Sequence, residues 1–316
     1  MRIKIAIFTP ASEFTVSQKH TLSQLGEVVY IQKRSALSLP KLLSLAKGAD
    51  IIAPDPDAFG GFEKASPRLT QVMDVSPHLK GICLSTTSFG WIDLDYCQKR
   101  HLPVCNIPGY SRESVAEHTL ALLLCLAKRI LITDRQTQKG QYQLGMGFEL
   151  KGKTLGIIGL GNIGSRVAEL GQGIGMKVIA YNHSRKHQTG VEAVSLKQLL
   201  KRSDAITLHV THEDKNRNLL GPKEISLMKP GVIIANTADR ELIDESTLAK
   251  TLKTNHAYGY AYEAEDLINT PLSQCENAIG LKGFGWYTKE ALNNLYEIWV
   301  DNIVSLARGH PQNRVA

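Results

Sequence analysis

Short apolar runs alternate with amphipathic stretches along the chain. Runs typical of strands come first at Ile3 to Phe8, Val28 to Ile31, Ile51 to Ala53 and Gly81 to Leu84. Helical patterns lie between them, which is the rhythm of a parallel sheet covered by helices. The segment Leu102 to Tyr110 then contains two prolines and a glycine, which break regular structure and indicate that the chain passes into a second domain.

A second alternating series follows this crossing. A long helical pattern runs from about Val115 to Thr137, with Ser114 as its expected N-cap. Strand-like runs follow at 154–159, 177–181, 205–209, 232–236 and 256–260, and the last stretch, Lys289 to Arg308, is again helical. We therefore predict an α/β protein with two doubly wound lobes, the second inserted into the first.

The segment GLGNIG, Gly159 to Gly164, has the G-x-G-x-x-G spacing of a dinucleotide-binding loop. It follows the strand pattern KTLGIIG and opens the helical pattern SRVAELGQGIG, which is the context that this motif requires. Gly159 permits a tight turn, Gly161 lets the backbone approach a pyrophosphate, and Gly164 lets the helix pack closely. The helix N-terminus also attracts phosphate.

The residues after the next strand select between the two nicotinamide cofactors. Asn182 stands where an Asp or Glu normally binds the ribose 2′-hydroxyl of NAD. A neutral Asn does not repel a 2′-phosphate, and Arg185 and Lys186 are able to bind one. We therefore expect NADP in preference to NAD. The alternative interpretation is that HSRK, at 183–186, is a solvated turn.

Composition narrows the class of protein. Hydrophobic residues make up 43% and charged residues 21% of the 316 residues, as in soluble globular proteins. Five scattered cysteines without CxxC spacing favour reduced thiols in a cytoplasmic protein and argue against a zinc site. The net charge of +7 comes from dispersed Lys and Arg, which favours no nucleic-acid partner. The longest apolar run, Leu120 to Ala127, is too short to span a membrane.

Several segments, in this order, resemble the D-isomer-specific 2-hydroxyacid dehydrogenases. They are PGYSRESVAEHTLALLL (108–124), LKGKTLGIIGLGNIGSRVA (150–168), SDAITLHVTHEDKNRNLL (203–220), MKPGVIIANTADRELIDESTLAKTL (228–252) and PLSQCENAIGLKGFGWYT (271–288). The resemblance implies a Rossmann NAD(P) domain at 102–288, inserted into a flavodoxin-like substrate domain formed by 1–101 and 289–316. It also implies a substrate cleft between the domains and a homodimer formed through the cofactor domain.

The resemblance further implies which residues contact the ligands. Backbone amides of the TTSFGW loop would bind a substrate carboxylate, at Ser88, Phe89 and Gly90. The aromatic rings of Phe89 and Trp91 would either reshape that pocket or pack at a domain interface. The cofactor-binding residues would lie on the glycine loop and after the following strands: Gly159, Gly161, Asn162, Ile163, Gly164, Asn182, Ser184, Arg185, His209, Val210, Thr237 and Ala238.

The residues that carry the chemistry in this family are altered here. The family uses an Arg to hold the substrate, a His to move a proton, and a Glu that pairs with the His. Asp239 stands at the Arg position and Gly283, within LKGFGW, at the His position. The segment that should carry the Glu is a few residues shorter, and its alignment is ambiguous: Glu263 would stand where the family has an Asp, and Glu265 would approach the catalytic Glu position. The alternative interpretation is that both are solvated loop acids.

Three residues are candidates to replace this set: Arg240, one residue late, Glu265, and Lys282, if it is desolvated. His118, on the long helix predicted from Val115 to Thr137 (the hinge helix), and His209, beside the cofactor, are not assigned the role. Two functions follow. One is an NAD(P)-dependent oxidoreductase with a divergent active site, acting on a small substrate such as a 2-hydroxy or 2-keto acid. The alternative is a catalytically inactive NAD(P)-binding pseudoenzyme that acts as a regulatory dimer.

Overall fold

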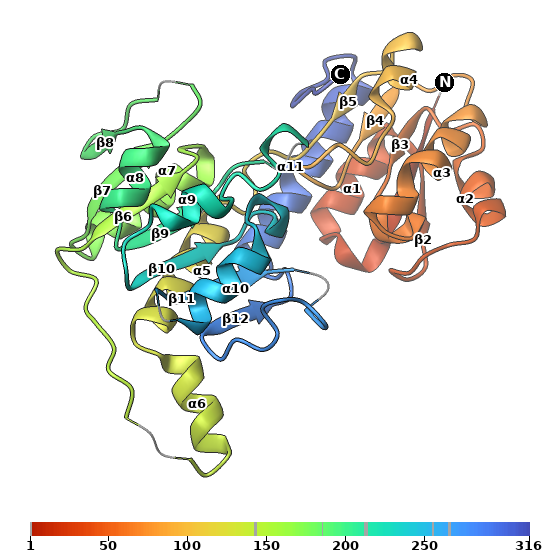
Figure 1. The fold of residues 1–316 in the computed structure, drawn as a ribbon. Coiled ribbons are helices and arrows are strands. Elements are labelled where there is room, and N and C mark those ends of the chain that lie inside the picture. The colour runs from red at the N-terminus through yellow and green to blue at the C-terminus, as the bar shows by residue number, and fades with distance from the viewer. Residues whose placement is uncertain (1, 142–143, 185, 212–213, 255, 265–266) are drawn as a thin grey trace. The chain divides into compact units, whose positions relative to one another are not determined.

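The computed structural model describes residues 2–141, 144–184, 186–211, 214–254, 256–264 and 267–316 (Figure 1). The chain forms two compact units. The first unit consists of residues 1–110 and 289–316, and the second of residues 111–288. The first crossing therefore lies after Tyr110, later than the predicted position 102, because the short strand at Val104–Cys105 pairs with the sheet of the first unit.

The sheet of the first unit is parallel, with strands in the order β2-β1-β3-β4-β5. This is the flavodoxin-like order and confirms the predicted class. The strands are β1 (Ile3–Pro10), β2 (Gly26–Ile31), β3 (Ile51–Ala53), β4 (Gly81–Cys83) and β5 (Val104–Cys105). The helices of this unit are α1 (Val16–Leu25), α2 (Leu39–Ala46), α3 (Phe62–Asp74), α4 (Leu94–Lys99) and α11 (Lys289–Ala307), with short 3-10 turns at Ala11–Glu13 and Pro56–Phe59.

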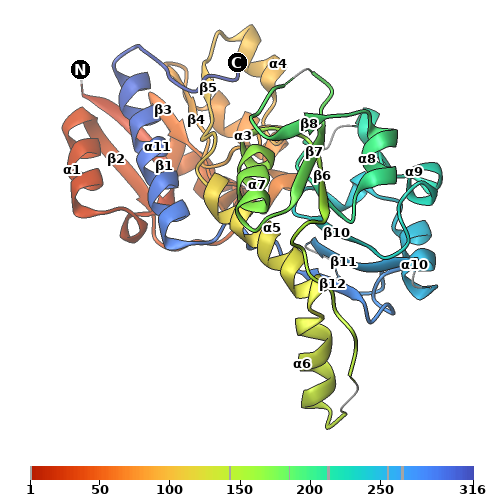
Figure 2. The same ribbon diagram turned by 90° about the vertical axis from the view of Figure 1, so that its left-hand side faces the viewer.

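Alternation along β1 divides the core of the first unit between the two faces of its sheet. Ile5 and Ile7 pack in one cluster with Trp299 of α11, whereas Ala6 and Phe8 belong to the cluster that contains residues of α2 and α3. Figure 2 shows α1 and α11 together on one face. The indole of Trp299 is fully buried and donates a hydrogen bond to the Cys83 carbonyl at 2.7 Å, so the last helix belongs to the N-terminal lobe.

The sheet of the second unit is also parallel, with strands in the order β12-β11-β10-β9-β6-β7-β8. Its centre has the Rossmann order, in which the sequence reverses beside β6. The strands are β6 (Thr154–Ile158), β7 (Lys177–Tyr181), β8 (Val191–Ala193), β9 (Ala205–Leu208), β10 (Val232–Asn236), β11 (Ala257–Glu263) and β12 (Ala278–Leu281).

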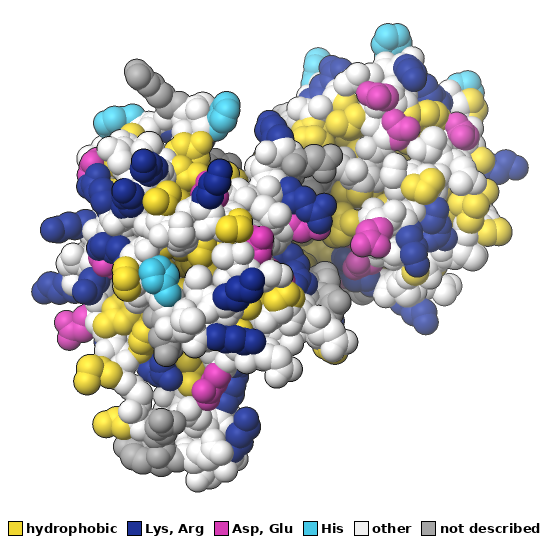
Figure 3. Space-filling view, viewed as in Figure 1, with side chains coloured by type: hydrophobic (Ala, Val, Ile, Leu, Met, Phe, Trp, Pro, Cys, Tyr) yellow, Lys and Arg dark blue, Asp and Glu magenta, His cyan; other side chains and the backbone are white. Residues whose placement is uncertain are grey.

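Helices cover both faces of this second sheet. One core cluster contains residues of α5 (Arg112–Ala127) and α7 (Asn162–Gly173), and the other contains residues of α8 (Leu196–Arg202), α9 (Pro222–Ser226) and α10 (Glu245–Lys253). Short 3-10 turns lie at Asp214–Asn216 and Arg240–Leu242. On the face shown in Figure 3, Lys and Arg side chains are spread among carboxylates and uncharged groups.

The predicted hinge helix is two helices. Arg129 has a left-handed backbone with φ of 57°, which ends α5 and sets off α6 (Ile130–Gln138) in a new direction. In Figures 1 and 2, α6 projects from the body of the second unit. The predicted N-cap is also wrong, because α5 begins after Ser111 and Ser114 lies within the helix. In the described ranges, the helices are too short or too polar to cross a membrane.

Candidate functional site

The glycine turn of the second unit has a shape that side chains would obstruct. Gly159 has φ of +97°, and a Cβ there would lie 2.5 Å from the His209 carbonyl oxygen. A Cβ on Gly164 would lie 2.0 Å from the Gly159 carbonyl oxygen, so α7 starts directly against the turn. Gly161 is the N-cap of α7, and apart from its chain neighbours no atom of the described residues lies within 4 Å of where its Cβ would be. The start of α7, with Asn162 and Ile163, therefore faces open space suited to a phosphate.

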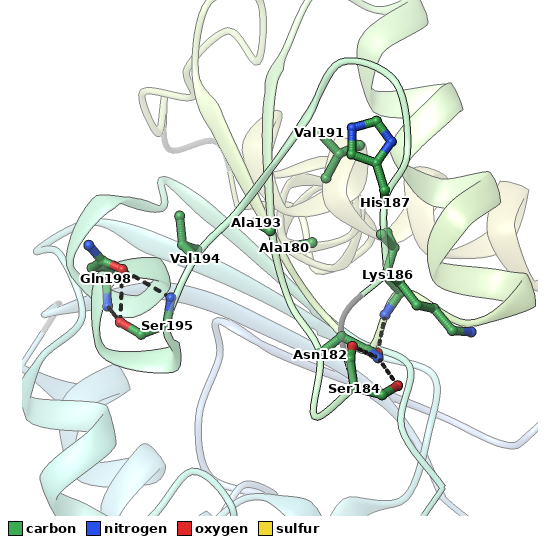
Figure 4. Close-up of a pocket in the computed structure, with 11 residues that line it drawn as sticks. Ala180, Asn182, Ser184, Lys186, His187, Val191, Ala193, Val194, Ser195 and Gln198 are labelled. Atoms are coloured by element: carbon green, nitrogen blue, oxygen red, sulfur yellow. Dashed lines mark hydrogen bonds between the residues drawn. The ribbon is translucent and has the colours of Figure 1, made fainter.

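A cavity of about 490 Å³ adjoins this turn at the end of β7 (Figure 4). Its lining residues in the described part of the chain include no carboxylate: Leu160, Ala180, Asn182, Ser184, Lys186, His187, Val191, Ala193, Val194, Ser195 and Gln198. The Asn182 amide nitrogen donates to the Ser184 carbonyl at 2.7 Å and lies 3.1 Å from its hydroxyl. The cavity therefore fits the adenosine half of a dinucleotide with a neutral rather than acidic ribose contact. Arg185 lies outside the described residues.

His209 follows β9 beside the glycine turn. Burial lowers the pKa of His209 to about 3, so its imidazole is neutral at physiological pH. The Nε2 atom is buried and has no hydrogen-bond partner among the described residues. Val210 lies next to it, and its Cγ1 atom would be only 2.7 Å from a Cβ on Gly159. The structure thus brings His209 and Val210 against the turn that would hold a pyrophosphate.

The loop after β10 is shaped by Asn236. Its side-chain oxygen accepts a hydrogen bond from the Ala238 N–H at 3.0 Å, and its nitrogen donates to the Asp239 carbonyl at 2.9 Å. The Asp239 carboxylate accepts from the Glu241 N–H at 2.8 Å and so caps the short 3-10 turn that follows. Thr237 directly follows β10, with its hydroxyl 3.1 Å from that of Thr119 on α5.

Arg240 forms a bidentate ion pair with Glu245, the first residue of α10. Its Nε lies 2.9 Å from Oε1 and its Nη2 2.5 Å from Oε2. The two side chains are only 27% and 12% exposed. The guanidinium predicted to hold a substrate is therefore engaged with a carboxylate of its own unit, a geometry that is strong and directional.

The loop from Leu281 to Thr288 carries no histidine, but it packs against His118 of α5. The Glu263 Oε1 atom accepts hydrogen bonds from the N–H groups of Phe284, at 2.9 Å, and Gly285, at 2.8 Å. The same Oε1 lies 3.3 Å from Nε2 of His118, which projects from α5. Burial raises the pKa of Glu263, but the His118 contact and the two N–H groups outweigh burial and leave that pKa below its usual value.

The remaining proton-transfer candidates are placed differently. Lys282 is exposed, so the desolvation on which its catalytic role depends is not present there. Glu265 lies outside the described residues. From the sequence, His118 is not assigned the role because it lies on the hinge helix, and no local pattern joins position 118 to position 263. Only the packing of α5 against β11 and the 283–285 loop reveals the pair.

In the first unit, the TTSFGW loop is held by its own tryptophan. The indole nitrogen of Trp91 donates to the Thr86 hydroxyl at 2.8 Å and the Ser88 carbonyl at 2.9 Å. Trp91 is 4% exposed and packs in the core of this unit, so its ring does not narrow a pocket as one interpretation held. Ser88, Phe89 and Gly90 are exposed.

Comparison with known proteins agrees with the fold and the glycine turn. Residues 120–281 match the family described as D-isomer specific 2-hydroxyacid dehydrogenase, NAD binding domain. A glyoxylate reductase of Thermococcus litoralis is 34% identical over 262 residues, which covers 78% of this chain and 79% of the relative. The chain belongs to the D-isomer-specific 2-hydroxyacid dehydrogenase family. It therefore has the nicotinamide-dinucleotide domain of that family in its second unit.

Two further relatives show the breadth of this family. An aromatic 2-oxoacid reductase of Clostridium sporogenes is 32% identical over 286 residues and covers 84% of this chain and 85% of the relative. Among solved structures, an acyclic imino acid reductase in complex with NADPH and D-Arg has a TM-score of 0.86 at 27% identity. That match covers 99% of this chain and 100% of the other.

Proposed function

We propose that the protein is an NAD(P)-dependent oxidoreductase that transfers a hydride between a nicotinamide and a small substrate, with catalytic side chains unlike those of its relatives. The observation that carries the proposal is the Gly159–Gly164 turn, which opens onto α7 beside the cavity at Asn182. Family membership supports the reaction class. The sequence differences at Asp239 and Gly283 support the altered catalytic set.

The residues of the second unit would hold the cofactor along the carboxyl edge of the sheet. Gly161 and the N-terminus of α7 would bind the pyrophosphate, and Asn182 and Ser184 the adenosine ribose. Thr237 and Ala238, together with His209 and Val210, would line the strand ends toward the nicotinamide. A bound nicotinamide supplies or accepts the hydride. The protein must then orient the substrate and move one proton.

We propose NADP as the preferred cofactor. Asn182 and Lys186 line the cavity, and its described lining residues carry no carboxylate to repel a 2′-phosphate. Titration calorimetry with both oxidised cofactors tests this preference. Tighter binding of NAD would contradict it.

The substrate we propose is small and carries a neutral or cationic group near Asp239. A carboxylate at that position repels a plain 2-keto acid, whereas it attracts a cation. Relatives are named for glyoxylate and 2-oxoacid reduction, and a structural neighbour is named for imino acid reduction. A carbonyl or imine substrate fits these observations. Arg240 remains a candidate to hold it only if its guanidinium leaves Glu245, and Lys282 only if it is desolvated.

The decisive experiment is oxidation of NADPH and NADH by the purified protein with three probes. They are glyoxylate, hydroxypyruvate, and the imine formed from glyoxylate and methylamine. We expect turnover with NADPH, faster with the imine than with glyoxylate alone. Cofactor binding without turnover of any probe would contradict the oxidoreductase proposal.

The alternative is a pseudoenzyme that binds NAD(P) and presents a regulatory dimer surface. Gly283 and Asp239 favour it, because neither residue can perform the family's proton transfer or hold an anion.

A homodimer is proposed in either case. The segment that projects with α6 exposes Leu144 by 86% and Met146 by 89%, which is costly for a monomer in water. Scattered thiols favour a cytoplasmic location. Sedimentation of wild-type protein and of a Met146→Asp variant tests the dimer.

A further inference from the structure

A histidine–carboxylate pair lies at the carboxyl edge of the second sheet. Nε2 of His118 is 3.3 Å from Oε1 of Glu263, which is the last residue of β11. Their side chains are only 14% and 10% exposed. In a doubly wound sheet, ligands bind outside the carboxyl ends of the strands. The pair therefore lies at the edge of the sheet where chemistry on a bound substrate is expected.

The helix that carries His118 is anchored at this same edge. The hydroxyl of Thr119, the next residue on α5, lies 3.1 Å from the hydroxyl of Thr237, directly after β10. Residues of β10 and β11 pair in register up to Asn236 and Tyr262, so Thr237 and Glu263 leave the sheet side by side. The imidazole is thus held at the ends of two neighbouring strands that face the proposed nicotinamide site.

The loop at 283–285 packs closely against both His118 and Glu263. A Cβ on Gly285 would lie 2.8 Å from Cδ2 of His118 and 3.3 Å from Oε2 of Glu263, so a larger residue would displace one of them. The Ser114 hydroxyl donates a hydrogen bond to the Gly285 carbonyl, which fastens the loop to α5. The glycine that follows Phe284 therefore serves to bring the loop onto the imidazole and the carboxylate.

The imidazole of His118 lies beside a carboxylate and an aromatic ring. Glu263 is the charged group that contacts the ring among the described residues, and the Phe284 ring packs edge-on at 5.0 Å between centroids. Glu263 is ionised, because its contacts lower its pKa despite burial. A carboxylate beside an imidazole stabilises the imidazolium and orients the ring. Nε2 lies 3.3 Å from the carboxylate, which leaves Nδ1 as the second proton-bearing nitrogen of an imidazolium.

We propose that His118 is the proton-transfer residue of this protein and that Glu263 is its positioning residue. In the reducing direction, hydride adds to the carbon of the C=O or C=N bond. Nδ1 of the imidazolium gives its proton to the oxygen or nitrogen as the double bond becomes single. The products are the alcohol or amine, the oxidised cofactor and a neutral His118, which regains a proton from water. This inference rests on the proposed function.

The test compares two variants with a matched control. His118→Asn removes the titrating ring. Glu263→Gln removes the charge but keeps an oxygen that can accept from Phe284 and Gly285. His78→Asn, at an exposed position of the first unit, is the control. For each protein, kcat and KM for NADPH oxidation are measured against pH with whichever of the three probes the wild type reduces. Thermal unfolding and NADPH binding are measured in parallel.

We expect His118→Asn to lower kcat by about 100-fold or more and to remove the alkaline limb of the pH profile, with NADPH binding retained. Glu263→Gln should lower kcat and leave KM for the probe near the wild-type value, because the ring loses the carboxylate that orients it. Wild-type turnover that persists in His118→Asn with its pH profile intact would overturn this inference and leave the proposed function standing. Absence of wild-type turnover with every probe would overturn both.

Discussion

The side-chain oxygen of Asn182 accepts a hydrogen bond from the backbone N–H of Leu160 at 3.0 Å, which joins the end of β7 to the glycine turn. The amide nitrogen of the same side chain donates to Ser184. Both ends of the amide are thus used, and its orientation is determined by the protein. The side chain at the position that normally discriminates between NAD and NADP is therefore uncharged and held by two hydrogen bonds.

Asn182→Asp should reverse the cofactor preference. The new carboxylate can still accept from Leu160 but repels a 2′-phosphate and accepts a hydrogen bond from the ribose of NAD. A hydrogen bond to a charged group contributes about 1.5–3 kcal/mol, so we expect a change of about 10-fold or more in the ratio of the two affinities. Titration calorimetry measures it. Asn293→Asp, on an exposed position of α11, should leave the ratio unchanged.

Gly164→Ala should destabilise the second unit and weaken cofactor binding. Its Cβ would lie 2.0 Å from the Gly159 carbonyl oxygen, so the turn or the start of α7 must move. Overpacking of this kind costs about 1–3 kcal/mol. Gly173→Ala on the same helix is the control, because apart from its chain neighbours and its own helix backbone no atom of the described residues lies within 4 Å of its Cβ position. Equal denaturation midpoints and equal NADPH affinities for the two variants would contradict the prediction.

His209 should make the protein less stable as pH falls from 7 to 5. Its pKa of about 3 in the folded state lies below the ordinary value of 6.5, so below pH 6.5 the unfolded chain binds a proton that the folded chain does not. The free energy of unfolding then decreases by up to about 1.4 kcal/mol per pH unit. We expect His209→Gln to lose less stability than wild type over this range in urea unfolding. Identical losses would show that His209 is solvated.

Gly283→His combined with Asp239→Arg should create or raise glyoxylate reduction. The first change supplies a proton donor on the 281–288 loop, and the second replaces a repulsive charge by one that binds a carboxylate. We expect an increase of about 100-fold in kcat/KM for glyoxylate over wild type. Each single variant serves as a control and should give less than the pair. A double variant that folds, binds NADPH and remains at the wild-type rate would indicate that other residues separate this protein from its relatives.

Much of the architecture could be predicted from the sequence because it depends on local patterns. Apolar runs of strand length alternate with helical ones, and this is enough to predict two parallel sheets. The glycine turn is recognisable because Gly159 and Gly164 meet within six residues of chain. The break at Arg129 could not be predicted, since a single left-handed residue interrupts an otherwise continuous helical pattern.

What the sequence determined by itself was the class of fold and the dinucleotide turn. These depend on spacing, which the order of residues contains. The tertiary structure decided which side chains meet. Arg240 is engaged by Glu245, Trp91 is buried in its own unit, and His118 reaches Glu263 from 145 positions away along the chain. Contacts of that kind arise when helices pack on a sheet, and no local pattern records them.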